Sequence, residues 1–179
     1  MTTSIKTERG FSLIESVVAL FVVTIGLLSL AAVLTHAMKQ VTSSSGEQLA
    51  KDKAYELLES IVAARETRLL TWDQLKNAAQ GGRFLDGVNQ VQNAGPDNIV
   101  GTQDDTGTAS YTEPGPDQAF GTADDRTIPL TGYTREIVIT NVSPPGAPDT
   151  LRQVVVTVRY KAAGYSRSYS LTTLVSSYS

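Results

Sequence analysis

The chain has 179 residues, of which 41% are hydrophobic and 18% are charged, and its formal net charge is −3. This length suits one domain with an ordinary core, and 15 basic against 18 acidic residues argue against a nucleic-acid binder. The absence of cysteine, with His36 as the single histidine, excludes disulfides, thiolate metal sites and histidine-rich metal centres. No serine has a histidine and an acid to activate it, so we expect a protein that is not an enzyme.

A 24-residue apolar run from Phe11 to Leu34 contains one charged residue, Glu15. A helix of roughly 20 apolar residues spans a bilayer core, so the run predicts a transmembrane helix. Lys6 and Arg9 precede it, and positive charge on a short N-terminal flank keeps that end in the cytoplasm. Secretory signal peptides have a shorter apolar region, of about 7 to 15 residues. The run therefore favours a retained membrane anchor.

The hexapeptide Gly10-Phe11-Ser12-Leu13-Ile14-Glu15 lies between the basic leader and the apolar run, and it resembles the type IV prepilin signal. The resemblance implies that an inner-membrane prepilin peptidase cuts between Gly10 and Phe11 and methylates the new terminal amine. It also implies that Glu15 pairs with the terminal amine of a neighbouring subunit, which gives a buried carboxylate a partner. The alternative is a simple signal anchor, because a carboxylate near the cytoplasmic boundary can stay partly hydrated.

The next segment has apolar residues at spacings of three and four from Leu49 to Val62, which predicts a helix whose apolar stripe faces a sheet. No proline occurs before Pro96, so we expect one helix from about residue 12 to about residue 67, weakest at residues 43–46. A second short helix is expected to begin near Thr71.

Residues 81–130 are rich in Gly, Asp, Asn, Thr and Pro without a sustained period, which predicts a long irregular loop. Three segments of alternating polarity follow, at 134–142, 151–160 and 166–175, and they predict an antiparallel meander. The expected fold class is therefore α+β, with the long helix packed on the sheet as in type IV pilins. We expect a leader at 1–10, a transmembrane and filament-core helix at 11–38, and a periplasmic head at 39–179 with its strands within 131–179.

The acidic loop contains an internal repeat, in which residues 95–105 and 115–125 share seven of eleven positions. From residue 95 to residue 125 the local charge is −7, with six aspartates, one glutamate and no basic residue. Carboxylates on turn-forming glycines suit calcium, which takes six to eight oxygen ligands. We expect one or two calcium ions, the ligand sets being Asp97, Asp104 and Asp105 for one and Asp117, Asp124 and Asp125 for the other. The alternative is two solvated acidic turns, because Gly, Pro, Asp and Thr are ordinary turn residues.

Both ends of the chain resemble V-type minor pilins, also called pilus modification proteins, through the apolar run, residues 46–61 and residues 152–177. The resemblance implies a low-abundance structural subunit that joins other minor pilins and the major pilin, primes assembly and can occupy the pilus tip. Two rivals stay open: an I-type pseudopilin of type II secretion, and a membrane-anchored calcium-dependent adhesin that never enters a filament. The expected location is the inner membrane as a single-pass precursor, and then an extracellular pilus or a periplasmic pseudopilus.

Overall fold

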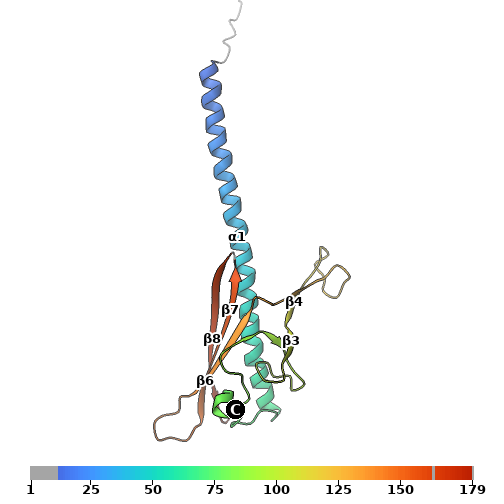
Figure 1. The fold of residues 1–179 in the computed structure, drawn as a ribbon, viewed down its shortest axis with the longest axis vertical. Helices are drawn as coiled ribbons and strands as arrows, with labels where there is room; N and C mark the ends of the chain where they lie inside the picture. The colour runs from blue at the N-terminus through green and yellow to red at the C-terminus, as the bar shows by residue number, and fades with distance from the viewer. Residues whose placement is uncertain (1–11, 163, 179) are drawn as a thin grey trace, which may run out of the picture. The chain divides into compact units, whose positions relative to one another are not determined.

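The computed structural model describes residues 12–162 and 164–178, and the chain divides into two compact units, Met1–Thr42 and Ser43–Ser179. The helix α1 (Leu13–Glu66) has 54 residues and belongs to both units (Figure 1). No proline interrupts it, so its backbone hydrogen bonds continue without a break. The single helix that the sequence predicts is confirmed. It ends before Arg68, whose left-handed φ of 61° cannot continue a right-handed helix.

The prediction of a second helix beginning near Thr71 is wrong. The residues after α1 form turns, and the only helical element between Thr71 and β1 is the short 3-10 helix η1 (Ala78–Gln80). The buried Arg152 donates hydrogen bonds to the carbonyl oxygens of Trp72 and Leu75 in this turn. The backbone then becomes extended at Asn77, with ψ of 153°, and this stops further winding.

The second unit contains a four-stranded antiparallel sheet in the order β1-β6-β7-β8. Its strands are β1 (Val88–Gln90), β6 (Thr134–Asn141), β7 (Leu151–Ala162) and β8 (Tyr165–Ser176). The last three follow one another in sequence and in space, which confirms the predicted meander (Figure 1). Burial alternates along β7 because successive side chains point to opposite faces of the sheet.

The core of this unit lies between α1 and one face of the sheet. The helix contributes a stripe at spacings of four and three, each residue at most 4% exposed: Ala50, Ala54, Leu57, Ile61 and Ala64. The sheet contributes Ile137, Ile139, Val154, Val156 and Val158. Alanines in the stripe let the helix approach the strands closely, and each large aliphatic side chain contributes about 1.5–3 kcal/mol on burial. The fold is α+β, as the sequence predicts.

Gly46 lies where the sequence indicates the weakest point of the helix, and its missing side chain has a packing role. A Cβ atom at this position would lie 3.0 Å from Cε2 of Tyr160 and 3.4 Å from the hydroxyl oxygen of Tyr133. These two rings stack, with centroids 5.6 Å apart and planes inclined by 8°. Gly46 therefore makes room for an aromatic pair, which offsets its low helix propensity.

The prediction of an irregular loop at 81–130 is wrong in one respect, because the segment contains short paired strands. Besides β1, β2 (Gln92–Asn93) pairs with β3 (Thr106–Thr108), and β4 (Ser110–Glu113) pairs with β5 (Arg126–Pro129). Apolar residues scattered through the segment anchor it, each at most 2% exposed: Phe84, Val91, Ile99, Val100, Ala109 and Leu130. Strands of two to four residues are too short to show alternation in a sequence.

Asn77 completes the sheet edge beyond the end of β1. The strand β1 pairs with β6 only at Thr134–Glu136. The backbone N–H and C=O groups of β6 beyond Glu136 that face this edge therefore need other hydrogen-bond partners. The side-chain amide of Asn77 donates to the carbonyl oxygen of Ile137, and its oxygen accepts from the N–H of Ile139, both at 2.8 Å. One buried side chain thus replaces a strand residue.

Replacing Asn77 by alanine should lower the free energy of unfolding by about 1–3 kcal/mol, because it leaves a buried N–H and a buried carbonyl without partners. Thermal unfolding of the full-length protein in detergent, followed by circular dichroism, measures the loss. Asn93→Ala is the matched control, since Asn93 is exposed and its one side-chain bond is long, at 3.4 Å. Equal melting temperatures for the two variants would contradict the role given to Asn77.

Candidate functional site

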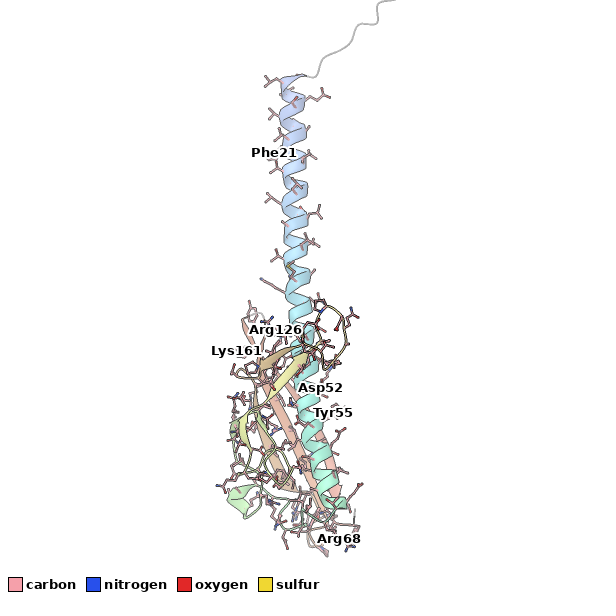
Figure 2. The ribbon with its side chains drawn as sticks, turned by 90° about the vertical axis from the view of Figure 1, so that its right-hand side faces the viewer. Phe21, Asp52, Tyr55, Arg68, Arg126 and Lys161 are labelled. Atoms are coloured by element: carbon pink, nitrogen blue, oxygen red, sulfur yellow. The ribbon has the colours of Figure 1, made fainter. Side chains whose placement is uncertain are left out.

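Residues 13–40 of the first unit form an exposed apolar helix. Every described residue from Ser12 to Gln40 is exposed, and Phe21, at 68%, projects into open space from the helix surface (Figure 2). This part of α1 has a mean hydropathy of 2.8 over 18 residues, which makes it long and apolar enough to cross a membrane. An uncovered apolar surface of this size is unstable in water, so it needs lipid or other apolar helices around it.

The hydroxyl groups in the same stretch are satisfied inside the helix. Thr24, Ser29 and Thr35 each donate to the carbonyl oxygen four residues earlier, at 2.7–2.8 Å. Such bonds remove the cost of taking a free hydroxyl into an apolar environment. These polar residues are therefore compatible with a helix surrounded by lipid or by other helices.

Glu15 is the acidic residue in the first turn of α1. The free N–H groups of a helix start favour a negative charge there. Among residues 12–162 and 164–178, Glu15 forms no ion pair. Gly10 and Phe11, the residues of the expected cleavage site, lie outside the described residues. The helix thus presents one exposed carboxylate at the start of an apolar surface.

The sequence repeat is also a structural repeat, and we call residues 95–105 the first loop and residues 115–125 the second loop. In each loop the first aspartate caps the N–H two residues on, at 2.9 Å, and the last aspartate accepts from the middle glycine at 2.6 Å. The threonine hydroxyl donates to the intervening aspartate, at 2.6 Å in the first loop and 2.7 Å in the second. The seven shared residues therefore specify one conformation twice.

Backbone geometry explains why two glycines recur. The middle glycines, Gly101 and Gly121, have φ of 87° and 85°, which other residues adopt at a cost. The leading glycines allow close approach, because a Cβ on Gly95 would lie 2.5 Å from Oδ2 of Asp104 and one on Gly115 would lie 2.0 Å from Oδ2 of Asp124. Both features belong to a turn that folds around its own aspartates.

The surroundings of the two loops differ completely. In the first loop, Ile99 and Val100 are buried in the core, Arg83 binds Asp97 at 2.8 Å, and Arg135 lies 3.7 Å from Asp105. In the second loop, residues 116–124 are all exposed, and it extends away from the strands that it connects (Figure 1). Among the described residues its aspartates form no ion pair.

The electrostatics of the loops follow from these contacts. The hydroxyl of Thr102 lowers the pKa of Asp104, and that of Thr122 lowers the pKa of Asp124. Burial raises the pKa of Asp105, although the Gly101 N–H and Arg135 oppose that rise. Sequence reasoning missed the two arginines, since Arg135 is 30 residues from Asp105 and no spacing pattern links such pairs.

Among the six aspartates named as calcium ligands, Asp104 and Asp105 share the hydroxyl of Thr102, and Asp124 and Asp125 share that of Thr122. Throughout the part of the chain that the structure describes, no group of three or more His, Cys, Asp or Glu side chains is placed to hold a metal ion. In both loops, carboxylate oxygens bind N–H or hydroxyl groups of the loop itself. Calcium binding stays a prediction.

The prokaryotic N-terminal methylation motif matches residues 5–31 of this chain. That stretch includes the expected cleavage site, Glu15 and most of the apolar surface described above. No curated protein and no solved structure matches the chain. The motif is of the prepilin type and covers 27 of the 179 residues, and the long apolar helix and antiparallel sheet that follow it are consistent with a pilin-like fold.

Proposed function

We propose that this chain is a minor type IV pilin of the V type, a structural subunit that helps to prime pilus assembly. The observation that carries the proposal is the methylation motif at residues 5–31, which overlaps a helical stretch, residues 13–38, whose side chains are all exposed. In a membrane, lipid covers this surface; in a filament, the equivalent helices of other subunits cover it. The second unit, Ser43–Ser179, then supplies the surface by which other subunits recognise this one. The V subtype rests on the resemblance of the two chain ends.

Glu15 has a physical role in this proposal. A carboxylate in an apolar helix bundle costs about 2.5–3.5 kcal/mol on insertion scales unless it finds a partner. The methylated amine of a neighbouring subunit carries the opposite charge and is released only by cleavage after Gly10. Pairing of the two groups would make assembly depend on processing, because residue 11 of an uncleaved chain has no free terminal amine to pair with Glu15.

Two other roles share the same motif or anchor. An I-type pseudopilin would enter a short periplasmic filament of a type II secretion system, and gene neighbourhood separates it from a pilus subunit. A membrane-anchored adhesin would stay in the cell envelope after filaments are sheared off. The partners in the proposed function are the prepilin peptidase, other minor pilins and the major pilin.

Processing should give a mature chain that begins with N-methylated Phe11. Intact-mass and N-terminal peptide analysis of the protein extracted from native membranes measures this. Gly10→Val should block the cut, because the peptidase must approach the backbone closely at that position. Gly26→Ala is the matched control: a Cβ there meets no atom within 4 Å, and normal processing is expected. Normal processing of Gly10→Val would refute the assignment of the cleavage site.

Replacing Glu15 by leucine should leave membrane insertion intact, since it makes the run more apolar, and should reduce incorporation into filaments at least tenfold. A tenfold loss corresponds to about 1.4 kcal/mol of lost pairing. Glu15→Gln separates charge from size and should behave like Glu15→Leu. Immunoblots of sheared filaments and of membranes give the ratio. Incorporation of both variants at the wild-type level would show that the carboxylate is dispensable.

We also propose that the acidic loops bind one or two calcium ions. The charge of −7 over residues 95–125 supports the proposal, and the second loop is the more accessible because no arginine pairs with its aspartates among the described residues. A ligand at 100 times its dissociation constant stabilises a protein by about 2.7 kcal/mol. Calcium should therefore raise the melting temperature of the full-length protein in detergent, and magnesium should do less.

Variants separate the two loops in this experiment. Asp124→Asn with Asp125→Asn should abolish the calcium heat of the second loop in calorimetry, and Asp104→Asn with Asp105→Asn should abolish that of the first. Asparagine keeps an oxygen for the loop's own N–H bonds, so the loop shape is retained. Absence of both calcium heat and a shift in melting at millimolar concentrations would leave two solvated turns.

A further inference from the structure

The two loops of the repeat have one conformation and opposite environments, and this contrast shows what the second loop lacks. The first loop is packed into the core, and we call its surroundings its seat: Val100 is 2% exposed, and Arg83 and Arg135 lie beside Asp97 and Asp105. The second loop carries Phe120 at the position of Val100, and Phe120 is 69% exposed. A larger apolar side chain therefore stands in water where its counterpart is buried.

Asp117 of the second loop corresponds to Asp97 of the first loop but differs from it in its ion pairing. In the first loop, Oδ1 of Asp97 caps the Ile99 N–H while Oδ2 binds Arg83. In the second loop, Oδ1 of Asp117 caps the Ala119 N–H in the same way, and Oδ2 has no cation among the described residues. Its geometry is already fixed by internal hydrogen bonds, so little conformational entropy is lost when a partner binds.

We propose that the second loop is a preformed docking element that inserts Phe120 into an apolar pocket on a neighbouring subunit, with Lys or Arg side chains of that subunit beside Asp117 and Asp125. The chemistry of this pocket is argued from the seat of the first loop. That the partner is a pilin-like subunit rests on the proposed function.

Two other occupants are disfavoured by the same observations. A second copy of this chain has its own equivalent seat filled, because its first loop already occupies the space around Ile99 and Val100. A membrane surface is disfavoured because the anionic headgroups of the bilayer would repel an element with Asp117, Asp124 and Asp125 and no basic residue between positions 115 and 125. A protein partner with a basic rim fits both the aromatic side chain and the charge.

The test is photocrosslinking in native cells of the full-length chain with a photoreactive phenylalanine analogue in place of Phe120. We expect one major adduct, with another chain that bears a prepilin motif, at a peptide that contains Lys or Arg. Asp117→Asn with Asp125→Asn should reduce the yield at least tenfold, and a chelator should not reduce it, because calcium bound in the second loop would compete for the same carboxylates. The matched control is Asp73→Asn, whose side chain is 92% exposed and lies outside the loop; its yield should equal the wild type.

Several results would overturn the docking proposal. These are adducts only with lipid or with a second copy, a yield unaffected by the double asparagine variant, or a yield abolished by the chelator, which would indicate an ion-bridged contact. Phe120→Ser with unchanged melting and unchanged incorporation would also overturn it. If the chain is absent from sheared filaments but still forms the adduct with a basic chain in the envelope, the proposed function fails and the docking proposal stands.

Discussion

The structure depends on one constraint: α1 has two apolar surfaces that must be covered in different ways. Residues 50–64 place a stripe of alanine, leucine and isoleucine on β6 and β7, which fixes the head. Residues 13–38 are exposed throughout. The first surface forms the core of a folded unit, and the second is long and apolar enough to cross a membrane. The methylation motif lies at the start of the second surface.

The periodic helix and strands are predictable from the sequence, but the long-range side-chain hydrogen bonds that hold them together are not. The helix and the three long strands repeat their patterns over eight residues or more, so one wrong residue does not hide them. The strands of residues 81–130 are too short to show a period. The role of Asn77 depends on where β1 stops, and the role of Arg152 depends on carbonyl groups about 80 residues away. Neither interaction leaves a local signal.

The candidate sites divide in the same way. Glu15 and the expected cleavage site can be named from the sequence because the motif is contiguous; the motif match covers residues 5–31, and the roles of these residues stay predictions. The repeat is visible in the sequence, but its two environments are not, since Gly101 and Thr102 are buried while the identical Gly121 and Thr122 are exposed. That difference comes from Arg83, Arg135 and the core around Ile99. The first loop therefore shows which contacts the second loop lacks: burial of its apolar side chain in a core and ion pairs with arginine.

The central claim is that this chain leaves the membrane and enters a filament. Quantitative mass spectrometry of sheared, purified filaments from the native cell tests it most directly. The account predicts that the chain is present, at a small fraction of the major pilin, while a membrane protein without a prepilin motif is absent from the same preparation. Filaments that lack the chain, with the chain retained in the membrane fraction, would contradict the account.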